Sequence, residues 1–131
     1  FGIAVNELTA IGREEWPAVT QIVFRNYQWG AEKRNSTLWY DDNFVGTELD
    51  TQVSYAGIAK ACGLQGVVAK TMDELTEALH TAIKDQMENG KTTLIEAMIN
   101  QELGEPFRRD AMKKPVAIAG ISVSDMQEQA V

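Results

Sequence analysis

The sequence predicts an α/β fold in which a parallel sheet lies between two helical layers. Residues 71–89 have the pattern of an amphipathic helix, and a short apolar run lies on either side of it. A helix between two strands is a β-α-β crossover, which makes the two strands parallel. A third run, Val19–Phe24, carries no charge and is rich in β-branched and aromatic residues. Such a run is typical of a strand buried on both faces of a parallel sheet.

The other elements follow from periodicity and from helix-ending residues. Leu8, Ile11 and Trp16 fall near one face of an amino-terminal helix, and Pro17 is expected to stop it. Gly63 is expected to end the helix at residues 53–62. The predicted order is helix 4–15, strand 18–25, helix 29–38, loop 40–52, helix 53–62, strand Gly66–Ala69, helix 71–89, strand Thr92–Ile99 and a tail.

The helix at residues 71–89 has the clearest signals at its two ends. Thr71 with Glu74 three residues later forms a capping box, and Gly90 is expected at the C′ position. Large apolar residues recur at helical spacing, which predicts a buried stripe. The stripe consists of Met72, Leu75, Leu79, Ile83 and Met87.

Composition limits the classes of function. The chain has 131 residues, is 44% hydrophobic and carries a net charge of −7. No apolar run is long enough to cross a membrane, and the negative charge argues against nucleic acid as a partner. The single cysteine, Cys62, excludes an internal disulfide and favours a cytoplasmic protein. Its helical spacing from Ile58 favours a core position over a catalytic thiol.

Asn26 follows the predicted strand 18–25, whose run Val19–Phe24 carries no charge, and it begins a turn that ends at Gly30. In open α/β sheets, ligands bind just beyond the carboxyl ends of the strands. Asn26 is therefore a candidate ligand-binding residue. The alternative is that Asn26 only turns the chain, since asparagine tolerates turn conformations well.

Three segments resemble the sulfoacetaldehyde acetyltransferase family, which belongs to the thiamine-diphosphate enzymes together with acetolactate synthase. They are Asn26–Lys33 (NYQWGAEK), Tyr40–Gly46 (YDDNFVG) and Glu105–Pro115 (EPFRRDAMKKP). The resemblance extends over the whole chain. It implies that residues 1–104 are the C-terminal portion of the diphosphate-binding domain and that residues 105–131 are a C-terminal tail.

The same resemblance implies thiamine diphosphate and Mg²⁺ as cofactors. In the family an Asp of a Gly-Asp-Gly turn, an Asn side chain and a backbone carbonyl bind the metal, and the last two correspond to Asn26 and Gln28. No Gly-Asp-Gly occurs in this sequence. Because Phe1–Ala10 resembles the helix after that turn, we expect the chain to be a fragment that is inactive alone. Its partners would be the missing N-terminal domains, a small-molecule substrate and further copies of the enzyme.

Other residues of the turn have implied roles near the cofactor. Glu32 lies six residues after Asn26, where pyruvate decarboxylases carry an acid/base glutamate, while acetolactate synthases carry an apolar residue. The alternative for Glu32 is a solvated side chain paired with Lys33 or Arg34. Trp29 could line the site or pack on the sheet, and Gly30 permits close backbone approach to a cofactor.

The tail carries a local cluster of positive charge. Arg108 and Arg109, with two nearby lysines, stand out on an acidic chain. Since the resembled enzymes handle a sulfonate and inorganic phosphate, these arginines could bind substrate anions. The alternative is a solvated tail or a subunit contact.

The activity implied by the resemblance converts sulfoacetaldehyde and phosphate to acetyl phosphate and sulfite. One alternative is an acetolactate-synthase-like carboligase or decarboxylase. Another is a non-catalytic assembly subunit, although the split thiamine enzymes that have separate chains retain Gly-Asp-Gly.

Overall fold

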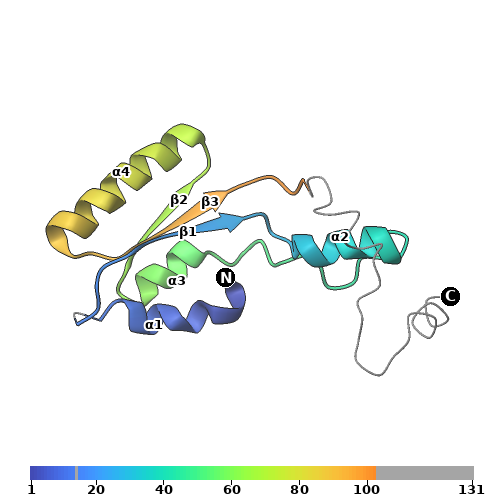
Figure 1. Ribbon diagram of the computed structural model, residues 1–131, viewed down its shortest axis with the longest axis horizontal. Helices are drawn as coiled ribbons and strands as arrows, with labels where there is room; N and C mark the ends of the chain where they lie inside the picture. Colours follow the sequence, from blue (N-terminus) through green and yellow to red (C-terminus); the bar gives the residue numbers. More distant parts are fainter. Residues whose placement is uncertain (14, 103–131) are drawn as a thin grey trace, which may run out of the picture.

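Three parallel strands form the sheet at the centre of the molecule, in the order β1-β3-β2. They are β1 (Thr20–Arg25), β2 (Gln65–Ala69) and β3 (Thr93–Met98). The computed structural model describes residues 1–13 and 15–102. Helix α4 covers one face of the sheet, and α1 and α3 lie on the other (Figure 1). The predicted α/β/α class with a parallel sheet is confirmed.

The helices are a 3₁₀ helix (Gly2–Glu7), α1 (Leu8–Ile11), α2 (Gly30–Trp39), α3 (Tyr55–Ala61) and α4 (Met72–Asn89). The prediction for the first of them, residues 4–15, was wrong in length and type. Ala4 has a non-helical backbone inside the 3₁₀ segment, and α1 ends at Gly12, well before Pro17. Trp16 therefore lies outside the helix and is exposed.

The core has two parts, one on each face of β3. Leu94 and Ile95 are fully buried and point to opposite faces of the sheet. On the α1 and α3 face, Leu94 packs in a cluster with Leu8, Val23, Ala56, Ala59 and Leu64. On the α4 face, Ile95 packs in a cluster with Ala69, Ala78 and Ala82.

The ends of α4 agree with the sequence prediction. The Thr71 hydroxyl accepts a hydrogen bond from the Glu74 N–H at 3.2 Å. The Glu74 carboxylate accepts from the Lys70 N–H at 2.6 Å, one residue before the usual partner in a capping box. Gly90 ends the helix with φ 61°, in the left-handed region.

The predicted buried stripe of α4 was only partly right. Leu75 and Leu79 pack against the core, but Met72, Ile83 and Met87 are exposed. Two alanines, 78 and 82, face the sheet in their place. Small side chains allow the helix to come close to the strands, and this turns the larger residues outward. The prediction assumed that the largest apolar side chains of α4 face the sheet. In the structure its smallest side chains do, because they let the helix backbone lie close to the strands.

Strand β1 lies at an edge of the described sheet and pairs only with β3. The prediction that it is buried on both faces was wrong, because Ile22 and Phe24 are exposed on the face that α4 leaves uncovered there. Val23 and Arg25, on the opposite face, are buried. Among residues 1–13 and 15–102, no helix has the length and apolar character needed to span a bilayer.

Candidate functional site

The turn between β1 and α2 contains the predicted ligand-binding residue. Asn26 follows the last residue of β1, as expected, and is half-buried. Its side-chain Oδ1 accepts a hydrogen bond from the Gln28 N–H at 3.3 Å. Tyr27 between them has φ 56°, in the left-handed region that non-glycine residues rarely occupy. Asn26 therefore shapes the turn, and its oxygen keeps further capacity to bind a ligand.

A second chain segment fixes the backbone of Gln28. Gln28 pairs with Glu48 in an isolated antiparallel bridge. The residues on either side of the bridged pair make its two hydrogen bonds. The Trp29 N–H donates to the Thr47 carbonyl at 2.7 Å, and the Leu49 N–H donates to the Tyr27 carbonyl at 2.8 Å. In such a pair the central residue directs its own carbonyl away from the partner strand. The Gln28 carbonyl is thus left available for another ligand.

The turn opens onto a cavity of about 390 Å³ at the carboxyl end of β1. The cavity brings together the five positions that the sequence placed at the site, which are Asn26, Gln28, Trp29, Gly30 and Glu32. Phe1, Phe24, Leu49 and Tyr55 supply apolar and aromatic walls. A concave, mostly apolar site with few polar groups is typical of cofactor binding.

Helix α2 begins at the edge of this cavity. Its first turn, from Gly30, has backbone N–H groups without helical partners, and such groups favour anions. Glu32 lies in this turn and is exposed. Lys33 forms its ion pair with Glu48, not with Glu32. The hydrogen bond from Lys33 holds the pKa of Glu48 below its usual value, although burial acts in the opposite direction.

Comparison with known proteins identifies the family of this chain. Residues 1–97 match the family described as thiamine pyrophosphate enzyme, C-terminal TPP binding domain. The chain belongs to this family. The match extends from the amino-terminal helix into β3, to its penultimate residue, and includes all residues that line the cavity described above.

Individual relatives carry a more specific name. The sulfoacetaldehyde acetyltransferase of Roseovarius nubinhibens is 85% identical over 131 residues, which is 100% of this chain. That of Rhodobacter capsulatus is 79% identical over 98% of the chain, and a probable sulfoacetaldehyde acetyltransferase of Rhizobium meliloti is 66% identical over 98%. The chain spans only 22% of the length of each of these three proteins.

The described residues suit the diphosphate of the family's cofactor together with Mg²⁺. Asn26 Oδ1 and the Gln28 carbonyl are oxygen atoms of the kind that Mg²⁺ prefers as ligands. The Gln28 side chain is buried, and its amide donates to the Gln101 carbonyl at 2.8 Å. Its Oε1 has no partner among the described residues, so this cavity wall has an unused acceptor. No group of three His, Cys, Asp or Glu side chains suited to a metal occurs in the described part of the chain.

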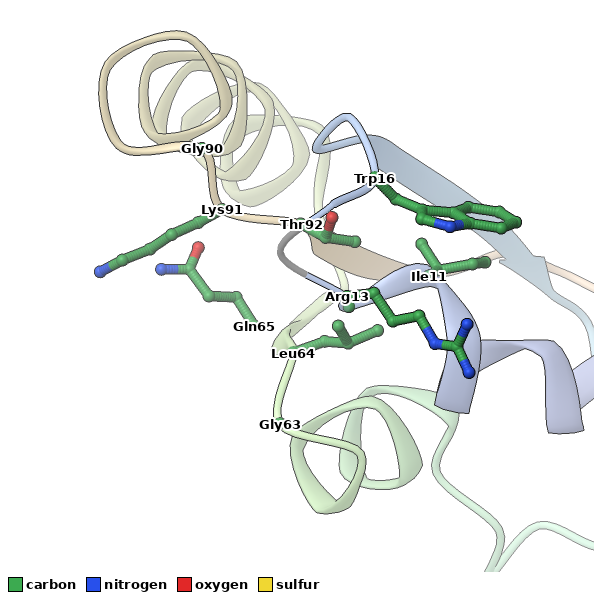
Figure 2. Close-up of a pocket in the computed structure, with 10 residues that line it drawn as sticks. Ile11, Arg13, Trp16, Gly63, Leu64, Gln65, Gly90, Lys91 and Thr92 are labelled. Atoms are coloured by element: carbon green, nitrogen blue, oxygen red, sulfur yellow. The ribbon is translucent and has the colours of Figure 1, made fainter.

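A second cavity, of about 370 Å³, lies at the opposite end of the strands, where β2 and β3 begin (Figure 2). Helices α1, α3 and α4 end beside it, next to Gly12, Gly63 and Gly90. Helix carboxyl ends carry partial negative charge, which disfavours a diphosphate. Arg13 and Lys91 also line this cavity and offset that charge. The cavity beside α2, at a helix amino terminus, remains the candidate diphosphate site.

Sequence reasoning missed the charged residues beneath the turn. Arg25 and Glu96 are buried on β1 and β3, with 3.6 Å between Arg25 Nε and Glu96 Oε1. A charged residue inside an otherwise apolar strand was the signal that could have revealed them. Arg108 and Arg109, the predicted substrate-anion residues, lie outside the described residues.

Proposed function

We propose that this chain is the diphosphate-binding part of a thiamine-diphosphate enzyme that converts sulfoacetaldehyde and inorganic phosphate to acetyl phosphate and sulfite. The observation that carries the proposal is the cavity beyond β1, where the five site positions line one space of about 390 Å³. The names of relatives that are up to 85% identical along the whole chain support the choice of substrate.

Asn26 and Gln28 would hold Mg²⁺ through a side-chain oxygen and a backbone carbonyl. Both ligands are uncharged, and in the resembled family a third, anionic ligand comes from the Asp of a Gly-Asp-Gly turn, which this sequence lacks. Gly30 would let the backbone approach the diphosphate closely, and the amino terminus of α2 would favour its negative charge.

Glu32 and Trp29 would act further along the cavity. When bound, thiamine diphosphate supplies the electron sink for cleavage and acyl transfer. Glu32 would give or take a proton at the reacting centre, because it lines the cavity and forms no ion pair among the described residues. Trp29, half-buried at the start of α2, would form an apolar wall that excludes water. Arg108 and Arg109 are proposed to bind the sulfonate or phosphate.

We also infer that the protein is cytoplasmic and works as a homo-oligomer. A lone, half-buried cysteine suits a reducing compartment, and the open edge of β1 suits contact with another chain or domain. Cell fractionation tests the location, and light scattering of the purified full-length protein tests the oligomeric state.

The activity is tested in the full-length protein that carries this sequence, supplied with thiamine diphosphate and Mg²⁺. We expect release of sulfite from sulfoacetaldehyde together with an equal amount of acetyl phosphate, only when phosphate is present. Pyruvate serves as the comparison substrate. Acetolactate formation from pyruvate without sulfite release from sulfoacetaldehyde would support the carboligase alternative and contradict the proposal.

A further inference from the structure

A buried ion pair lies directly beneath the proposed metal-binding turn. Arg25 is the last residue of β1 and Glu96 lies in the middle of β3, and both side chains are 3% exposed. Val23 is the strand partner of Glu96, so Arg25 and Glu96 lie diagonally on one face of the sheet. The 3.6 Å between Nε and Oε1 is longer than a hydrogen bond. The guanidinium and the carboxylate therefore attract each other by charge, and each forms its hydrogen bonds with other residues.

The Arg25 guanidinium contacts both the turn after β1 and the segment that leads into α3. Its Nη2 donates to the Asp50 carbonyl at 2.7 Å and to the Val53 carbonyl at 3.3 Å. It also stacks on two aromatic rings, at 4.4 Å from the centre of the Tyr27 ring and 4.7 Å from that of Tyr55. Arg25 thus connects the residue between Asn26 and Gln28 with the loop before α3.

The Glu96 carboxylate secures that loop from the other side. Its Oε2 accepts hydrogen bonds from the Ser54 hydroxyl at 2.9 Å and from the Ala56 N–H at 3.0 Å. Ser54 is the N-cap of α3, and its hydroxyl accepts from the Gly57 N–H at 3.1 Å. The pair therefore links β1, β3, the loop and the start of α3 in one network.

We propose that Arg25 and Glu96 are positioning residues that hold Asn26 and Gln28 in the geometry needed to bind the metal and diphosphate. Buried ion pairs contribute little net stability, because desolvation offsets their attraction. Arg25, which Glu96 holds by charge, contacts Tyr27, and the left-handed backbone of Tyr27 lies between the two proposed ligands. This inference rests on the proposed function of the cavity.

The test uses the full-length protein and measures two quantities, the melting temperature and the affinity for thiamine diphosphate in the presence of Mg²⁺. Arg25→Met leaves Glu96 as an uncompensated buried charge, so it is expected to lower both. The double variant Arg25→Met/Glu96→Leu replaces the pair with apolar side chains. We expect it to melt above Arg25→Met, because no buried charge is left uncompensated, but to bind the cofactor about 10–100-fold more weakly than wild type, as when groups that orient metal ligands are removed.

Thr93→Val is the matched control. Thr93 is equally buried, but it lies at the other end of β3, where its hydroxyl donates to Gln65 at 2.8 Å. This variant is expected to lower the melting temperature without changing cofactor affinity. A double variant that binds like wild type, or a control that weakens binding to the same extent, would overturn the positioning role alone. Wild-type protein that does not bind the cofactor would overturn the proposed function and the inference with it.

Discussion

The Asn26 side chain fixes the turn and still keeps an acceptor lone pair that could bind a ligand. Its Oδ1 fixes the turn by accepting from the Gln28 N–H, and the same oxygen has a second lone pair. The two interpretations of Asn26 are therefore compatible. The Gln28 carbonyl also remains available for a ligand. The bridge to Glu48 is formed by hydrogen bonds of the neighbouring residues and does not use this carbonyl.

At Glu32 we expect a catalytic effect that is separate from binding. Glu32→Gln keeps the size and the helical position of the side chain but removes its ability to exchange a proton. If Glu32 is the acid/base group, turnover should fall about 10²–10⁴-fold while cofactor affinity stays near wild type. Steady-state kinetics and cofactor titration of the full-length protein measure both. Turnover within twofold of wild type would identify Glu32 as a solvated residue.

Residue-scale prediction succeeded where a local pattern carried the information. The position of Asn26 at the carboxyl end of β1 was predicted correctly, because the apolar run Val19–Phe24 leads into a polar turn and this pattern is visible in consecutive residues. Arg25 and Glu96 were missed because their partnership joins residues 71 positions apart. A charge in an apolar strand marks each residue locally, but no local pattern shows that the two residues pair.

Among the elements, α3 and β2 pack so closely that only glycine fits between them. A Cβ at Gly66 would lie 2.1 Å from the Ala56 carbonyl oxygen, and that oxygen belongs to backbone that cannot rotate away. We expect Gly66→Ala to destabilise the fold by at least about 1–3 kcal/mol, as overpacking does. Thermal unfolding followed by circular dichroism measures the change.

Gly57→Ala is the control for this prediction. Gly57 lies in α3, where a Cβ would meet only the Ser54 side chain at 3.4–3.5 Å. Alanine is favoured over glycine in a helix by about 1 kcal/mol, so this variant should be neutral or stabilising. Equal melting temperatures for the two variants would contradict the close packing at Gly66.

The ion pair between Lys33 and Glu48 connects α2 to the segment that bridges Gln28, and it should depend on pH. Lys33 lowers the pKa of Glu48 from its usual 4.5. A lowered pKa in the folded state means that the stabilisation is present above 4.5 and is lost as the pH falls through the lowered value. We expect Glu48→Gln to reduce the melting temperature slightly at pH 7 and to match wild type in strong acid. A difference that is the same at both pH values would exclude this pair as its cause.

At the scale of the whole molecule, the order of elements and the layers could be predicted from sequence. The signals for them, which are hydrophobic periodicity and the residues that begin or end helices, are local in the chain. The orientation of α4 could not be predicted, since it depends on how closely Ala78 and Ala82 approach the sheet. The exposure of Ile22 and Phe24 was also missed. A charge-free strand predicts burial, but it does not show what would cover its outer face.

The isolated 131-residue chain should bind the cofactor weakly. Its described residues offer Mg²⁺ only neutral oxygens at the turn, and they contain no group of three metal-binding side chains. Neutral ligands alone do not readily displace the waters of Mg²⁺. Calorimetry with thiamine diphosphate and Mg²⁺ is expected to detect no sub-micromolar binding. Tight, Mg²⁺-dependent binding to this chain would contradict the need for an anionic ligand from elsewhere.

The central claim is that the turn after β1 holds the metal and diphosphate, and a titration of the full-length protein tests it most directly. Thiamine diphosphate is titrated with and without Mg²⁺ into wild type, Asn26→Ala and Asn35→Ala. Asn35 is an exposed residue of α2 that does not line the cavity, so its variant should bind like wild type. We expect Asn26→Ala to bind at least about tenfold more weakly and to lose most of its Mg²⁺ dependence, with its melting temperature within a few degrees of wild type. Equal, Mg²⁺-dependent affinity in all three proteins would contradict the claim.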